Sequence, residues 1–152
     1  MSILALDPGT RETGFALFDD NRVAYSGVKA NEEILAMLAG WQDPATRLAT
    51  EVFQAMGMAV GAEVFDTAIW TGRFIQAWHS PDAVIRIKRT QVKLQLCGSA
   101  RAKDPNVRQA LLDAIGPAGT KKAPGPCFGV KSHAWSALAV AVTAQAMIEG
   151  LA

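Results

Sequence analysis

The stretch MSILALDPGTRETG (residues 1–14) decides how the rest of the chain is interpreted. A short apolar run, residues 3–6, ends in the carboxylate of Asp7, and Pro8-Gly9 follows at once. A short apolar run bounded by turn residues is typical of a buried strand, and Pro-Gly predicts a turn. A second strand over residues 15–18 and a third over 23–25 flank an acidic turn. The sequence therefore predicts an antiparallel meander.

Asp7 is the first candidate functional residue. A carboxylate at the end of a buried strand is costly unless it has a charged partner or a metal ion. Alternatively, its side chain caps the turn at Gly9 and Thr10. Asp7 alone does not decide between these interpretations.

Composition restricts the class of protein. The chain has 152 residues, of which 50% are hydrophobic and 19% charged, which suits one domain with a sizeable core (residues 1–152) and excludes a disordered or fibrous protein. No apolar run approaches the roughly 18 residues of a membrane span, and no signal peptide is recognisable. Two cysteines, Cys97 and Cys127, are too few for a zinc site and do not suggest a disulfide framework. We expect a cytoplasmic protein.

The charge is distributed unevenly along the chain. Residues 1–85 contain 5 Lys or Arg and 11 Asp or Glu, a net charge of −6, whereas residues 86–131 contain 10 and 2, a net charge of +8. A basic segment beside an acidic one indicates a polyanionic partner, with the acidic residues solvated or holding cations. The alternative is that the basic segment is a solvated face.

A second carboxylate lies among apolar neighbours in the predicted strand over residues 47–53. Glu51 is informative because glutamate is rarely buried without a partner. It is either a second acidic group of a functional site or one half of an ion pair with an arginine.

The remaining segments alternate between helix and strand signals. Asn31 is a predicted helix cap. A long helix over residues 63–78 has its predicted core face at Val64, Ala68, Gly72 and Ile75, widened by Trp70, Phe74 and Trp78. A strand is predicted over residues 83–87. Further helices are predicted from Thr90 to Leu96, from Asp104 as cap, and from Ser132 as cap to about Gly150, with a Gly/Pro-rich loop over residues 116–131 that is long enough to be functional or mobile.

This order of elements is that of a ribonuclease-H-like domain: an α/β fold whose five-stranded mixed sheet contains the antiparallel meander and is flanked by helices. In that fold the first and fourth strands are neighbours, so Asp7 and Glu51 face each other. Adjacent carboxylates raise each other's pKa unless a cation neutralises them. Oxygen ligands suit Mg²⁺ or Mn²⁺, and two such ions promote phosphodiester hydrolysis.

Four stretches together resemble the RuvC-type Holliday junction resolvases: LALDPGTRETGFALFD, TEVFQAMG, VKLQLCGSARAKDPNVRQALLDAIG and KSHAWSALAVAVTA. The resemblance spans nearly the whole chain and is nearest to the small members encoded by phages and prophages. It implies a homodimer that nicks opposed strands of a four-way DNA junction with Mg²⁺ or Mn²⁺, in the bacterial cytoplasm or that of a phage's host. It also implies that Asp7 and Glu51 are catalytic and bind the metal.

The C-terminal helix of the family supplies two further catalytic positions, which fall here on His133 and Ser136. Histidine is tolerated at the first position and can bind a metal through a ring nitrogen. Serine at the second departs from the usual aspartate and is a weak, usually neutral ligand. A junction-binding protein with weak or no cleavage is therefore an alternative. Without the resemblance, a lone histidine at a helix start such as His133 is more often a surface or capping residue than a metal ligand.

The resemblance also suggests DNA contacts and a dimer contact. The basic residues are expected to follow phosphates and give salt-sensitive binding, Phe53 is a candidate wedge near the branch point, and the helix over residues 63–78 is the candidate dimer seam. The predicted phosphate contacts are Lys93, Arg101, Lys103, Arg108, Lys121, Lys122 and Lys131.

Two further functions share some of these features. The motif Asp7-Pro8-Gly9-Thr10 before Gly14 also fits the phosphate hairpin of the sugar kinase/actin/chaperone superfamily, but those proteins need a second copy of the domain and a second glycine-rich loop, which these residues do not contain. A nuclease of the same fold that acts on RNA is the other alternative.

Overall fold

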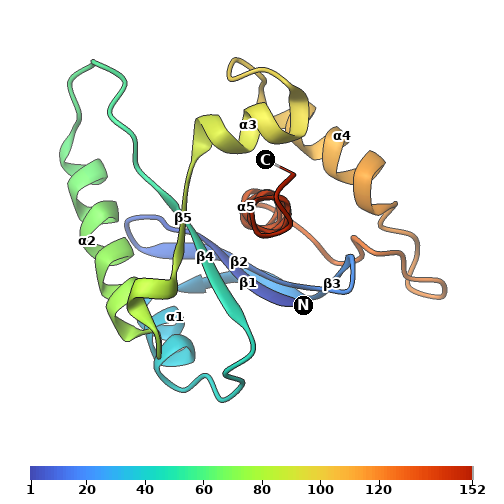
Figure 1. Cartoon of the computed structure of the whole chain (residues 1–152), viewed down its shortest axis with the longest axis horizontal. Helices are drawn as coiled ribbons and strands as arrows, with labels where there is room; N and C mark the ends of the chain where they lie inside the picture. The colour runs from blue at the N-terminus through green and yellow to red at the C-terminus, as the bar shows by residue number, and fades with distance from the viewer. Residues whose placement is uncertain (152) are drawn as a thin grey trace.

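The computed structural model describes residues 1–151, which form a mixed sheet covered by helices (Figure 1). The strand order across the sheet is β3-β2-β1-β4-β5. The strands are β1 (Ser2–Asp7), β2 (Glu12–Asp19), β3 (Arg22–Ala30), β4 (Arg47–Val52) and β5 (Ile85–Lys88). The helices are α1 (Asn31–Ala39), α2 (Ala62–Ala77), α3 (Arg89–Cys97), α4 (Asp104–Ile115) and α5 (Ala134–Ile148), with a 3₁₀ turn at Pro81–Ala83.

The first three strands form the predicted antiparallel meander. β1 pairs with β2 so that Asp7 lies opposite Gly14, and β2 pairs with β3. The turn between β2 and β3 contains Asp20 and Asn21 at φ 49° and 58°, the left-handed conformation that two-residue hairpins favour. On its other side β1 runs parallel to β4, with Leu6 opposite Thr50. β1 is therefore the central strand.

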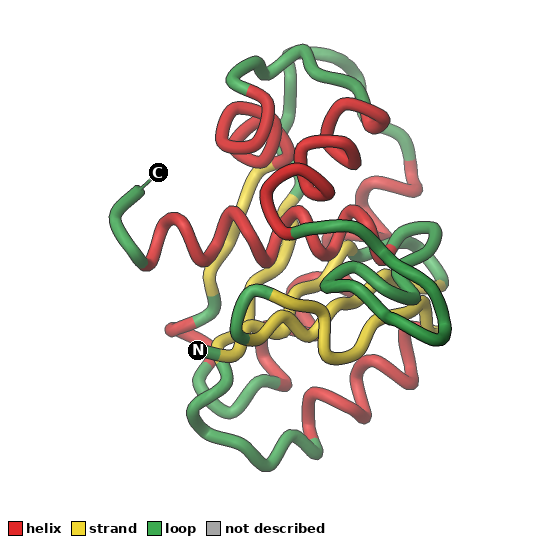
Figure 2. The backbone as a smooth tube through the Cα atoms, turned by 90° about the vertical axis from the view of Figure 1, so that its right-hand side faces the viewer, coloured by secondary structure: helices red, strands yellow, loops and turns green. Residues whose placement is uncertain are grey.

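The sheet separates two hydrophobic clusters, and alternate residues of β1 enter each. Ile3 and Ala5 belong to the cluster beneath α3, α4 and α5, whereas Leu4 and Leu6 belong to the cluster beneath α1 and α2. Figure 2 shows the helices on the two sides of the strands. Burial on both faces explains why β1 is an uninterrupted apolar run.

Several predicted helix starts are displaced by one or two residues, and the displaced residues have other roles. Asn31 is the first residue of α1 and is fully buried, so it does not cap the helix. Asp104 is the first residue of α4 and follows the cap Lys103. Ser132 has φ +51°, outside the helix, and His133 occupies the cap position of α5. α3 starts at Arg89, and the Thr90 hydroxyl donates a hydrogen bond to Gln54 at 2.8 Å.

The predicted core face of α2 is confirmed at Phe74 and Trp78, which are buried, and wrong at Ala68 and Gly72, which are exposed. Thr71, which was not predicted, is also buried. The larger aromatic side chains bury more apolar area than Ala or Gly, and they determine which way the helix is turned. Phe65 and Ile69 remain 60% and 63% exposed on the outer face.

The loop over residues 116–131 is ordered by backbone hydrogen bonds. The Val23 amide donates to Pro126 at 2.9 Å, which ties the loop to β3, and the Gly125 amide donates to Ala118 at 2.8 Å. Cys127, within this loop, is fully buried and belongs to the core cluster beneath α3, α4 and α5. In the described part of the chain, no helix is long and apolar enough to cross a membrane.

Candidate active site

Asp7 and Glu51 lie side by side because they end two neighbouring parallel strands. Their side chains are only 14% and 18% exposed, and they are within hydrogen-bonding reach of each other. Burial, followed by the charge of Asp7, raises the pKa of Glu51 to about 7. Burial also raises the pKa of Asp7. The pair carries an excess of negative charge that a cation would relieve.

Asn31 holds the turn that follows Asp7. Its Nδ2 donates a hydrogen bond to the Gly9 carbonyl at 3.0 Å, and its Oδ1 accepts one from the Thr13 hydroxyl at 2.6 Å. Within residues 1–151 no hydrogen bond joins the Asp7 side chain to this turn. Asp7 is therefore left to face the cleft, and the capping interpretation of this residue is wrong.

Gly14 allows His133 to approach Asp7. A Cβ atom at Gly14 would collide with the backbone of His133, so only glycine lets the start of α5 lie this close to β2. The imidazole Nδ1 is 3.4 Å from Oδ2 of Asp7, and the side chain of His133 is 66% exposed. The histidine thus reaches the acidic pair from the solvent side.

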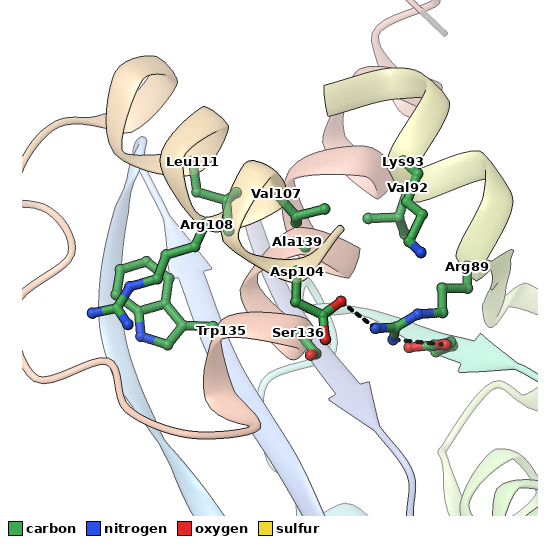
Figure 3. Close-up of a pocket in the computed structure, with 11 residues that line it drawn as sticks. Arg89, Val92, Lys93, Asp104, Val107, Arg108, Leu111, Trp135, Ser136 and Ala139 are labelled. Carbon is green, nitrogen blue, oxygen red and sulfur yellow. Dashed lines mark hydrogen bonds and ion pairs between the residues drawn. The ribbon is translucent and has the colours of Figure 1, made fainter. Parts of the chain in front are cut away.

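Arg89 lies between two carboxylates of the same cleft (Figure 3). Its Nη1 is 3.7 Å from Oε1 of Glu51, and its Nη2 is 2.5 Å from Oδ1 of Asp104. Burial alone would lower the pKa of Arg89, but the surrounding carboxylates outweigh it and raise the pKa. The ion pair that the sequence offered as an alternative for Glu51 is therefore present, in addition to the contact with Asp7.

Ser136 and Asp104 lie along the same open cleft, whose volume is about 580 Å³. Asp7, His133 and Arg89 line it too, so all four predicted catalytic residues are at or next to this cleft. Sequence reasoning missed Arg89 and Asp104. The available signal was that Asp104 is one of two acidic residues in a strongly basic segment.

The donor atoms fit a hard divalent cation, but they do not enclose one. In the described residues no group of three or more His, Cys, Asp or Glu side chains is arranged to hold a metal ion. Carboxylate oxygens such as those of Asp7 and Glu51 are the ligands that Mg²⁺ prefers, and Mg²⁺ usually keeps several waters and binds through one or two carboxylates plus substrate phosphates. The residues present therefore suit an ion that arrives with water or phosphate.

The predicted DNA-contacting residues lie in two groups. Lys93 and Arg108 line a smaller apolar pocket beside Ser136, where the Arg108 guanidinium lies 4.7 Å from the centre of the Trp135 ring (Figure 3). Phe53 is 51% exposed just beyond β4. The other basic residues are exposed positions outside that pocket: Arg101, Lys103, Lys121, Lys122 and Lys131.

No protein-family model and no curated protein matches the sequence. Among solved structures, RuvC of Thermus thermophilus superimposes with a TM-score of 0.68 at 21% identity, covering 99% of this chain and 98% of that one. The chain has a RuvC-like, ribonuclease-H-like fold. T. thermophilus RuvC in complex with a Holliday junction substrate gives a TM-score of 0.64 at 21% identity, covering 99% and 97%. The predicted fold class is confirmed.

Proposed function

We propose that this protein is a divalent-metal-dependent endonuclease that resolves four-way or other branched DNA. The observation that supports the proposal is that Asp7 and His133 line one cleft, while Glu51 interacts with Asp7 and lines the pocket that adjoins it. The full-length likeness to RuvC, including a complex with a Holliday junction substrate, supports the choice of branched DNA over RNA or ATP. The likeness to phage-encoded members remains a prediction.

Asp7 and Glu51 would hold Mg²⁺ or Mn²⁺ together with water or substrate phosphate, and His133, which stands beside Asp7, would join them as a third ligand only once the side chains rearrange. Such ions activate a water and stabilise the leaving oxygen in phosphodiester hydrolysis. The fold contributes by placing the two carboxylates near the ends of two rigid neighbouring strands. The pairing of β1 with β4 fixes the spacing between them. The Asn31 contacts hold the turn beside them.

A homodimer through α2 would supply two such sites. Its outer face presents Phe65 and Ile69 with the small residues Ala68 and Gly72 beside them. Small residues allow a second helix to approach closely, and the exposed apolar side chains supply area to bury. Two sites related by a two-fold axis match the two-fold character of a junction.

A junction-binding protein with weak cleavage is the second candidate. Two observations favour it: Ser136 brings no carboxylate to the cleft, and Arg89 already neutralises part of the charge of Glu51. The basic segment would still provide binding to phosphates.

Cleavage of a synthetic four-way junction in Mg²⁺ or Mn²⁺ tests the proposal. We expect paired nicks from the wild type and none from Asp7→Asn. Asp113→Asn is the matched control, because Asp113 is exposed on α4 and bonds only Gln109 within the described chain. Binding without nicking in either metal would favour the second candidate, and ATP hydrolysis without nuclease activity would favour the kinase-like alternative.

A further inference from the structure

A small apolar pocket lies next to the catalytic cleft, between α3, α4 and α5 (Figure 3). Val92 from α3, Val107 and Leu111 from α4, and Ala139 from α5 line it, and all four are buried. Trp135, half-buried in the first turn of α5, completes the apolar lining. Core side chains normally fill such space themselves, so a pocket left open here has room for a flat apolar group from another molecule.

Two cationic side chains flank this pocket. Lys93 reaches it from α3 and Arg108 from α4, on opposite sides (Figure 3). The Arg108 guanidinium lies 4.7 Å from the centre of the Trp135 ring. Within residues 1–151 neither cation forms an ion pair with a carboxylate. Both charges are therefore available to the phosphates of a nucleic-acid strand that crosses the pocket.

The pocket adjoins the cleft in which the proposed chemistry takes place. Arg89, Asp104 and Ser136 line both of them, and Glu51 lines the pocket while it interacts with Asp7. A strand with one phosphate beside the carboxylates would thus carry a neighbouring base to the mouth of the pocket. The apolar lining and the flanking cations suit the two halves of a nucleotide, its base and its phosphate.

The volume of the pocket limits what can enter. It measures about 50 Å³, whereas one water molecule needs about 10–15 Å³ on the same scale, so a whole nucleotide does not fit. A flat base can enter part-way, with its faces against the apolar walls and its polar edge at the mouth beside Ser136 and Asp104. Contact through the faces accepts any base, because every base has a π-face.

We propose that this pocket receives one unstacked base of the DNA strand in the catalytic cleft, with Trp135 as its aromatic wall and Lys93 and Arg108 on the adjacent phosphates. The inference rests on the proposed function and adds to it a site that fixes the register of the strand. Unstacking costs least where base pairing is already interrupted, which favours a branch point over continuous duplex. The alternative is that Trp135 only supports Arg108 and the start of α5.

The test combines protein variants with four-way junctions that lack one base. Each nucleotide near the branch point is made abasic in turn, and affinity is measured by fluorescence anisotropy in EDTA, so that no strand is cut. One abasic position should weaken wild-type binding about tenfold, the scale of one lost base–aromatic stack. Trp135→Ala should weaken binding of the intact junction similarly and remove the sensitivity to that abasic position. Trp135→Phe should retain most of it.

Trp70→Ala is the matched control, because Arg73 lies 4.1 Å from the Trp70 ring on α2, on the other side of the sheet. It should leave the ratio of intact to abasic affinity at the wild-type value. Val107→Phe fills the pocket instead of removing a wall and should also abolish the sensitivity. Thermal unfolding verifies that each variant is folded, and the two opposite changes keep the test independent of a single truncation.

A scan in which no abasic position weakens wild-type binding would overturn the inference. Equal losses from Trp135→Ala on intact and abasic junctions would also overturn it, because Trp135 would then act only through Arg108 and α5. Cleavage in Mg²⁺ separates this failure from failure of the proposed function. If the wild type nicks junctions while the scan is flat, only the inference fails. If it neither prefers junctions to duplex nor nicks them, both fail.

Discussion

At the scale of single residues, Gly14 fixes how closely His133 can approach Asp7. The two strands place Gly14 opposite Asp7, and the backbone of His133 fills the space where a Cβ would lie. Gly14→Ala should therefore push the start of α5 away, lower Mn²⁺ affinity and destabilise the fold by about 1–3 kcal/mol, as overpacking does. Mn²⁺ binding and denaturant unfolding measure the two effects.

Gly61→Ala, just before α2, is the control for this substitution. Nothing lies within 4 Å of a Cβ built at Gly61, and its φ of −89° and ψ of 177° are open to any residue. Alanine should therefore leave the Mn²⁺ affinity unchanged and change the free energy of unfolding by no more than about 1 kcal/mol. If Gly14→Ala and the wild type bound Mn²⁺ equally well, metal binding would not depend on the close approach of His133 to Gly14.

Asn31 is the second residue on which the site depends. Asn31→Ala removes its bonds to Gly9 and Thr13 and leaves buried polar groups unpaired, so we expect a loss of about 1–3 kcal/mol in the free energy of unfolding. Thr13→Val should lower the free energy of unfolding less in the Asn31→Ala background than in the wild type. In that background the partner of the Thr13 hydroxyl is already gone. Additive losses in urea unfolding would contradict the assigned bond.

At the scale of elements, the parallel pairing of β1 with β4 brings two acids together and makes stability depend on pH. The pKa of Glu51 is raised to about 7 from 4.5, so the native state binds a proton that the unfolded state has already lost in that interval. The stabilisation that protonated Glu51 contributes is complete below about pH 4.5 and is lost as the pH rises through about 7. The loss amounts to roughly 3 kcal/mol at most.

Urea unfolding of the metal-free protein at pH 5 and pH 8 measures this dependence. The wild type should be less stable at pH 8, and Glu51→Gln should flatten the curve, because glutamine does not titrate. Addition of Mg²⁺ at pH 8 should recover stability if it binds the ionised pair. If Glu51→Gln kept the full pH dependence of the wild type, a group other than Glu51 would be responsible for it.

The strands that carry Asp7 and Glu51 were predictable because their signals are local and strong. β1 is an apolar run closed by Pro-Gly, and Glu51 stands out among apolar neighbours. The order of elements then made the two strands neighbours, which is what the register shows. Sheet topology thus follows from the sequence without any knowledge of side-chain contacts.

The residues that sequence reasoning missed each had a sufficient local explanation. Asn31 and Asp104 are of the types that cap helices, so nothing local indicated that Asn31 bonds Gly9, 22 residues away, or that Asp104 pairs with Arg89. The face of α2 was predicted correctly at Phe74 and Trp78 but too broadly, since Ala68 and Gly72 are exposed. Several apolar stripes fit the sequence of this helix, and only packing selects the one that Phe74 and Trp78 share.

At the scale of the whole molecule, the uneven charge becomes a difference between the two sides of the sheet. The basic segment forms α3, α4 and the loop beside α5, whereas α1 and α2 come from the acidic part and cover the opposite face (Figure 1). Lys121→Gln with Lys122→Gln should weaken junction binding and reduce the slope of log affinity against log salt by about 2. An unchanged slope in fluorescence anisotropy would remove this loop from the DNA surface.

In the proposed dimer, paired cleavage would depend on two copies meeting through the exposed face of α2. Ile69→Asp puts a charge in the middle of that face, beside Phe65, and Ile69 is 63% exposed in the single chain. The substitution should therefore leave the fold intact while it prevents dimer formation, because a charge cannot be buried there without a partner. Sedimentation should show a monomer where the wild type is a dimer.

The DNA products then report whether dimerisation serves cleavage. On a supercoiled plasmid that extrudes a cruciform, the wild type should give linear DNA from two coordinated nicks, whereas Ile69→Asp should give mostly nicked circles. Glu63→Gln on the first turn of the same helix is the control, since it removes a charge without placing one in the apolar face. Linear product from a monomeric Ile69→Asp protein would show that the two cuts do not require this interface.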